Sequence, residues 1–343
     1  MSEKSLNYDK VNYGFSLLKA LMAFEVILAH FCNWEEYDPL VVWPFRELVS
    51  LAVSCFAIMS FYLMTGFFLK RDHTRFIQRI KRLSIPQIGW ALIYFLAYLF
   101  LNLLCHAGLP LKPIDLFWQM LTGHSMNLNP TMWYQFNVII ITVAFYFIFS
   151  KTNDHKGFLS LIILLFFSYF MQYSGINRAL FGNLPFELKK PLGRIFEVTP
   201  FAVIGFALKY SNILERLKKY RYLVMIICVV AFLTGFRVPW PEVKGFDYSG
   251  LAKPYLSLCI VTFAYLVPLE YLNQNMKKVI IQITDYTMGI YCSHRLVYTL
   301  LYFVFPKLSL HSFERCVLIY ILCYIFCFLI SKIPLKEIKQ LVK

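Results

Sequence analysis

Long apolar stretches alternate along the chain with short segments that hold most of its charged residues. A helix needs about 20 mostly apolar residues to cross a hydrocarbon core of roughly 30 Å. Helices satisfy their own backbone hydrogen bonds in lipid, so the pattern predicts an all-α, polytopic membrane helix bundle. About ten spans are predicted: Phe15–Phe31, Leu48–Leu69, Ile85–Cys105, Met132–Ser150, Phe158–Tyr173, Phe196–Leu208, Tyr222–Phe236, Pro254–Leu272, Tyr286–Phe305 and Arg315–Ile333.

The three stretches that begin at Phe158, Phe196 and Tyr222 are short for a span. We expect them to be extended by neighbouring residues, tilted or broken. In the second span, Thr65-Gly66 is expected to permit close helix approach, because small residues line contacts between membrane helices. No segment between spans is long enough for a soluble domain, so residues 1–343 are expected to form a single integral-membrane domain.

Composition and charge agree with a membrane protein. Hydrophobic residues make up 59% of the chain and charged residues 15%, whereas soluble domains carry about 25% charged residues. The net charge of +15 would suggest nucleic acid in a soluble protein, but here the basic residues gather between the spans, which argues for no nucleic-acid partner. Most of them lie on the side of the N-terminus, so both termini are predicted to be cytoplasmic. The loop Arg178–Arg194 is the one segment that disagrees with this orientation, because its basic residues would lie on the non-cytoplasmic side. It is called the discordant segment below.

The nine cysteines lie mostly within or near the ends of apolar stretches, and no CxxC pair occurs. A cysteine in such a stretch is usually a small buried hydrophobe. The sequence therefore predicts neither a disulfide framework nor a metal site.

The first span carries three ionisable residues, Lys19, Glu25 and His30. Such a residue at the centre of a span costs about 2.5–3.5 kcal/mol on insertion scales. Lys19 and His30 are eleven residues apart, so they share one helix face, roughly 16 Å apart along the axis. Glu25 lies off that face. Either the two form a polar line through the membrane, or Lys19 extends to one interface and His30 sits at the other.

A basic segment, Arg75 to Trp90, is expected as a loop before the third span. It is either a topology signal or an anion site. Arg75, Arg79 and Arg82 recur at spacings of four and three, so they could share one face.

Two further groups of residues are candidates for chemistry. Trp133 and Tyr134 open the fourth span, as an aromatic belt at the membrane interface or as a sugar-binding platform. His294 lies near the middle of the ninth span with Arg295 beside it and Tyr291 one turn earlier on its face. A histidine in mid-span indicates a functional site, with a core histidine bonded to a carbonyl as the alternative.

Five segments, in order along the whole chain, together resemble acyltransferase family 3, the integral-membrane O-acyltransferases. They are Lys19 and His30 with ten residues between them, Met59–Gly66, the basic segment running into Ile85-Pro86 and Trp90, Met132-Trp133-Tyr134, and Tyr286–Tyr291 followed by His294. The chain departs from the family pattern at Lys19, Met59 and Thr65, which stand for Arg, Pro and Ser. Lys cannot make the planar bidentate contact of Arg, which bears on any donor-binding role of Lys19.

The resemblance implies an enzyme of a bacterial cytoplasmic (inner) membrane. Such proteins transfer an acyl group, usually acetyl, from cytoplasmic acyl-CoA to hydroxyls of surface polysaccharides or lipid-linked glycans on the far side. The implied partners are membrane lipid, acetyl-CoA as the acyl donor, and a glycan acceptor, with a homodimer possible.

Roles for individual residues follow from placing that reaction on the polar line. Lys19, Arg75, Arg79 or Arg82 would hold the CoA phosphates, and His30 would be the general base. His294 would polarise the thioester or bind the donor, and Trp133, Tyr134 and Tyr291 would lie beside the substrate. Glu25 and Arg295 are expected to pair with each other and to belong to the substrate-binding residues as well. The rival interpretations are a transporter or flippase for a glycan or glycolipid, and a sensor or assembly subunit without chemistry.

Overall fold

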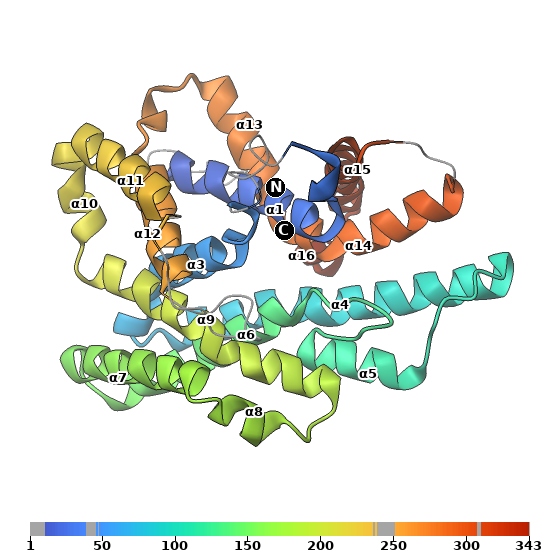
Figure 1. The fold of residues 1–343 in the computed structure, drawn as a ribbon, viewed down its shortest axis with the longest axis horizontal. Coiled ribbons are helices and arrows are strands. Elements are labelled where there is room, and N and C mark those ends of the chain that lie inside the picture. The colour runs from blue at the N-terminus through green and yellow to red at the C-terminus, as the bar shows by residue number, and fades with distance from the viewer. Residues whose placement is uncertain are drawn as a thin grey trace.

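The computed structural model describes residues 11–38, 46, 48–235, 237–238, 251–306 and 310–342. Within these residues it contains helices and no strand (Figure 1). The longer helices are α1 (Tyr13–Phe31), α3 (Ala52–Leu69), α4 (His73–Cys105), α6 (Trp133–Lys151), α7 (Asp154–Tyr173), α9 (Phe186–Tyr210), α11 (Arg221–Gly235), α12 (Ala252–Leu266), α13 (Gln274–Asp285), α14 (Thr287–Val304) and α15 (Ser312–Lys332). The shorter elements are η2 (Trp34–Glu36), α5 (Pro113–Thr122), α8 (Ile176–Phe181), α10 (Ile213–Leu217), η3 (Lys218–Tyr220), η4 (Leu269–Tyr271) and α16 (Lys336–Val342).

The all-α, polytopic prediction is confirmed. Each of the ten predicted spans coincides with a helix, and eight helices in the described part are long and apolar enough to cross a membrane, with α12 and η4 counted together. The other two are α11, which has 15 residues, and α14, whose apolar run is interrupted by Ser293, His294 and Arg295. For these two, spanning stays a prediction, and Phe236 and the first ten residues lie outside the described part.

Two segments expected as loops are helical. The basic segment from Arg75 to Trp90 forms the first half of α4, which has 33 residues and is about 50 Å long at about 1.5 Å per residue. The side chain of Asp72 caps its N-terminus by accepting the backbone N–H of Arg75. The discordant segment is largely helical as well. Its second half, from Phe186, forms the first turns of α9. The prediction of loops was wrong because it followed the high charge of the two segments. The helical spacing of Arg75, Arg79 and Arg82 had indicated a helix.

Helix α3 is the most enclosed span, and it packs most extensively against α9. The close approach of these two helices occurs at Gly205, where a Cβ atom would lie 2.2 Å from the carbonyl oxygen of Ile58. Gly66 is exposed and has no atom within 4 Å of such a Cβ, so the predicted packing role of Thr65-Gly66 is wrong. The glycine that packs is on the partner helix.

The C-terminal helix α16 folds back into the bundle against α4, α14 and α15, near the middle of Figure 1. The indole N–H of Trp90 donates to the carbonyl of Leu341 at 2.8 Å, and Val342 is fully buried. Gly289 on α14 makes room for it, since a Cβ there would lie 2.9 Å from the Cα of Val342. The end of the described chain is therefore part of the core.

Candidate active site

Two cavities share one wall. The first, the His30 cavity, has a volume of about 490 Å³ and lies around the end of α1, with His30, Trp34 and Trp133 in its lining. The second, the Lys19 cavity, has a volume of about 780 Å³ and lies around the start of α1, with Lys19, Arg79 and Tyr134 in its lining. Tyr291 of α14 lines both cavities. The polar line predicted along α1 therefore joins two separate spaces.

Two histidines stack at the shared wall. The rings of His30 and His294 are 5.5 Å apart between centroids and 15° from parallel. His30 is exposed to its cavity, whereas His294 is fully buried. The Nδ1 atom of His294 lies 2.6 Å from the carbonyl oxygen of Tyr291. A carbonyl only accepts, so Nδ1 carries the proton of a neutral ring and Nε2 keeps a lone pair, which has no hydrogen-bond partner in the described structure.

Packing and hydrogen bonds fix both rings. Phe31, next to His30, stacks on Tyr298 of α14 with centroids 4.1 Å apart, which holds the end of α1 against α14. The hydroxyl of Tyr94, fully buried on α4, donates to the carbonyl of Cys292 and accepts the N–H of Leu296, both at 2.9 Å. A regular α-helix would join those two groups directly. The turn of α14 that carries His294 is therefore held from α4.

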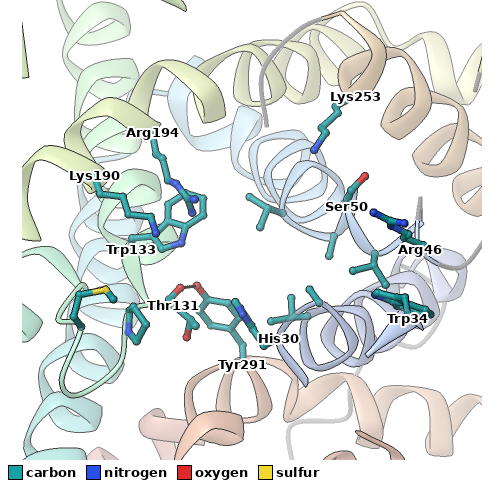
Figure 2. Close-up of a pocket in the computed structure, with 17 residues that line it drawn as sticks. His30, Trp34, Arg46, Ser50, Thr131, Trp133, Lys190, Arg194, Lys253 and Tyr291 are labelled. Atoms are coloured by element: carbon teal, nitrogen blue, oxygen red, sulfur yellow. Dashed lines mark hydrogen bonds between the residues drawn. The ribbon is translucent and has the colours of Figure 1, made fainter. Parts of the chain in front are cut away.

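Tyr291 is held in place from the loop before α6. Its hydroxyl donates to the carbonyl of Thr131, and its ring lies 6.2 Å from that of Tyr134, centroid to centroid. Thr131 is itself held by Asn129, whose Oδ1 accepts the Thr131 backbone N–H at 3.0 Å. Figure 2 shows Thr131, Tyr291 and His30 side by side at one wall of the His30 cavity.

The four predicted donor-binding cations all line the Lys19 cavity: Lys19 from α1, and Arg75, Arg79 and Arg82 from α4. Lys336 and Lys339 of α16 join them. Asp285 is the only carboxylate among the described lining residues. Sequence reasoning did not single out these two lysines as candidate ligands, and their spacing of three residues was the available signal.

The His30 cavity has its own cations, which sequence reasoning missed. They are Arg46, Lys190, Arg194 and Lys253. The guanidinium of Arg194 lies over the indole ring of Trp133, 4.1 Å from its centroid. No Asp or Glu is among the described residues that line this cavity. Lys190 and Arg194 belong to the discordant segment, which was the signal that could have found them.

Comparison with known proteins identifies the family to which the chain belongs. A family model described as "Acyltransferase domain" (Acyl_transf_3) matches residues 12–332. The chain belongs to acyltransferase family 3. No curated protein and no solved structure matches it. Membership of the family makes this chain a membrane acyltransferase. The matched residues include the histidine pair and the described lining of both cavities, apart from Lys336, Lys339 and Gln340 of α16.

The family-like aromatic pair at the start of α6 is divided between the cavities. Trp133 lines the His30 cavity and Tyr134 the Lys19 cavity, because neighbours on a helix point about 100° apart. Trp133 is 4% exposed and Tyr134 is 8% exposed. Such burial does not fit an aromatic belt, whose members face the lipid interface.

The structure does not bring Glu25 and Arg295 together. No ion pair joins them in the described structure, and neither lines the His30 cavity or the Lys19 cavity. Glu25 is buried and its Oε2 has no hydrogen-bond partner there. Glu25 is five residues from His30, about 140° around α1, while Arg295 is turned about 100° from His294 on α14. Because the histidines face each other, the two charged residues point elsewhere, and the expected pairing was wrong.

Proposed function

We propose that the protein transfers an acetyl group from acetyl-CoA, bound in the Lys19 cavity, to a hydroxyl group of a glycan in the His30 cavity. The observation that carries this proposal is the shared wall: Tyr291 lines both cavities, and the histidine pair stands beside it. In a bacterial cytoplasmic membrane with both termini inside, the Lys19 cavity would face the cytoplasm. The acceptor would then be a surface polysaccharide or a lipid-linked glycan.

The Lys19 cavity suits the chemistry of coenzyme A. Six cations and one carboxylate in its lining leave an excess of positive charge for the diphosphate and the ribose phosphate of the donor. Arg75, Arg79 and Arg82 offer planar donor groups for bidentate contact with phosphate, and Lys19 lies deeper along α1 as a point charge. Apolar side chains from α3, among them Met64 and Phe67, would cover the pantetheine arm. Its volume falls in the usual range of ligand cavities, about 300–1,000 Å³.

His30 is the general base of this proposal. It would take the proton of the acceptor hydroxyl as the hydroxyl oxygen attacks the thioester carbonyl. Collapse of the tetrahedral intermediate breaks the C–S bond, and the imidazolium of His30 returns the proton to the leaving thiolate. The products are an acetyl ester and CoA, so atoms and charges balance without a metal or a covalent enzyme intermediate.

His294 acts in this proposal through His30. Its ring is completely buried and lines neither cavity, so we assign it to positioning the ring of His30 by stacking. Its Nδ1–H donates to the carbonyl of Tyr291, which fixes the tautomer and the orientation of the ring, and its complete burial disfavours a charge on it. A neutral His294 adds no further positive charge beside the ring of His30 when His30 accepts a proton.

The test replaces His30 by Ala and measures glycan acetylation by mass spectrometry in cells that carry or lack the protein. We expect acetylation to fall about 10²- to 10⁴-fold, the usual contribution of a general base. Binding of acetyl-CoA to the purified variant should be unchanged, because His30 does not line the donor cavity.

His311→Ala is the matched control, since His311 is exposed just before α15 and lines neither cavity. Wild-type acetylation by His30→Ala would remove His30 from the chemistry. Movement of a glycan lipid across the membrane without incorporation of labelled acetyl groups would instead support a transporter.

A further inference from the structure

The His30 cavity is positively charged on a side of the protein where positive charge is uncommon. Lysines and arginines are depleted in the non-cytoplasmic loops of membrane proteins. Under the predicted orientation, Arg46, Lys190, Arg194 and Lys253 all lie on that side, and all four line the cavity. A topology signal therefore does not explain them, and all four border the same space.

The four cations come from separate parts of the chain. Arg46 precedes α3, Lys190 and Arg194 lie one turn apart on α9, and Lys253 opens α12. Figure 2 shows Lys190 and Arg194 on one side of the cavity and Arg46 and Lys253 on the other, with His30 between them. The charge is therefore arranged around the space in which the acceptor hydroxyl must lie.

The charge of the described lining is positive. Four cations and no carboxylate are among the described residues that line the cavity. Neutral sugars need none of this charge, because they are bound by hydrogen bonds and by stacking on aromatic rings such as Trp34 and Trp133.

The position of Arg194 at the cavity is held by an aromatic ring. Its guanidinium lies over the indole of Trp133, 4.1 Å from the ring centroid, and only 8% of the residue is exposed. A carboxylate or phosphate in the cavity would therefore meet a positive charge whose place is already set by packing.

We infer that the acceptor is an anionic glycan, one that carries a carboxylate or phosphate group close to the hydroxyl that is acetylated. This inference rests on the proposed function, since it names the acceptor of the same site. Arg194 and Lys190 hold the anionic group, and His30 faces the hydroxyl. The shared chemistry is an anionic oxygen group, from an acidic sugar or from the diphosphate of a lipid carrier.

The experiment measures binding of two matched pairs of probes to the full protein in nanodiscs of neutral lipid, without acetyl-CoA. One pair is trigalacturonic acid and its methyl ester. The other is N-acetylglucosamine on a prenyl diphosphate and the same sugar on a neutral prenyl glycoside. We expect the charged member of one pair to bind about tenfold more tightly at low salt, with the advantage reduced at high salt as charges are screened.

Neighbouring lysines on α9 supply the control. Lys190 lines the cavity, whereas Lys189 points elsewhere and donates to the carbonyl of Gly182. Lys190→Gln should reduce the advantage of the charged probe several-fold, and Lys189→Gln should leave it unchanged. The pair that responds identifies the source of the anionic group.

Equal binding of the charged and neutral members of both pairs would overturn the inference, as would an absence of binding by both charged probes. Loss of the charge preference in Lys189→Gln to the same extent as in Lys190→Gln would overturn it as well. Because no donor is present, these results do not depend on acetyl transfer. Acetylation of a glycan in cells together with indifference to probe charge would leave the proposed function standing and remove this inference alone.

Discussion

The two cavities are both rich in cations, yet they differ in what the charge signifies. In the Lys19 cavity, basic residues lie where the positive-inside rule places them, so topology and ligand binding predict the same sequence pattern. Under the predicted orientation, the cations of the His30 cavity lie on the opposite side, so the same rule does not account for them. A residue that conflicts with a general rule is therefore more informative about function than one that satisfies it.

Removing positive charge from the Lys19 cavity should give the largest difference between the two cavities in their effect on ligand binding. In the double variant Arg79→Gln and Arg82→Gln, we expect the KM for acetyl-CoA to rise about 10- to 100-fold, because two charge-assisted contacts to phosphate are lost. Binding of the anionic acceptor probe should not change. Steady-state kinetics with varied donor concentration gives the first value and probe binding the second.

Lys81→Gln is the matched control for this variant. Lys81 lies beside Arg82 on α4, is exposed, and does not line the cavity. A similar rise in KM for Lys81→Gln would mean that overall surface charge, and not a donor site, attracts acetyl-CoA.

A smaller effect is expected where the cavities meet. Tyr94→Phe removes the hydroxyl that bridges Cys292 and Leu296 around His294, without touching either cavity. Leaving buried backbone groups unpaired costs about 1–3 kcal/mol, so we expect a lower unfolding midpoint and a kcat reduced about tenfold. The KM for acetyl-CoA should be unchanged.

The split between kcat and KM distinguishes a positioning role from general damage. Tyr98→Phe removes a similar hydroxyl one turn along α4, which bonds to Thr299, farther along α14. If both variants lose the same fraction of kcat, the bridge at His294 has no special role in orienting the histidine pair.

The smallest effect concerns Glu36 in η2, which follows α1 and contacts the start of α15. Glu36 accepts the backbone N–H of Ser312 at 2.9 Å, and this bond lowers the pKa of the Glu36 carboxyl. Since its pKa is lower in the folded state than in the unfolded state, the bond stabilises the protein above the ordinary glutamate pKa of about 4.3. That contribution is lost as the pH falls through the lower, folded value.

Thermal unfolding at two pH values measures this effect. Glu36→Gln should lower the unfolding midpoint slightly at pH 6, and the difference from the wild type should shrink at acidic pH. A difference that grows as the pH falls would contradict the assigned sign of the pKa shift.

The predictions that the structure confirms concern residues that share a face of one helix. The spacing of Lys19 and His30 placed both on one face of α1, and each lines a cavity. Tyr291 shares a face with His294, as expected from their three-residue spacing. Such relations depend only on the geometry of a single helix, which the apolar pattern determines.

Relations between helices could not be derived in the same way. Glu25 and Arg295 were paired because both are costly in a membrane, but the rotation of each helix is set by its packing. The cations of the His30 cavity come from three stretches of sequence, so no local spacing connects Arg46 with Lys190 or Lys253. The role of Gly205 was hidden because its contact is with the backbone of another span.

The position of α16 has a consequence for how the protein is made. Lys336 and Lys339 complete the wall of the Lys19 cavity, and Leu341 and Val342 anchor that wall to α4 and α14. During synthesis this helix leaves the ribosome after every other described element. The wall that α16 supplies is therefore the last part of the Lys19 cavity to be put in place, after the four cations of α1 and α4.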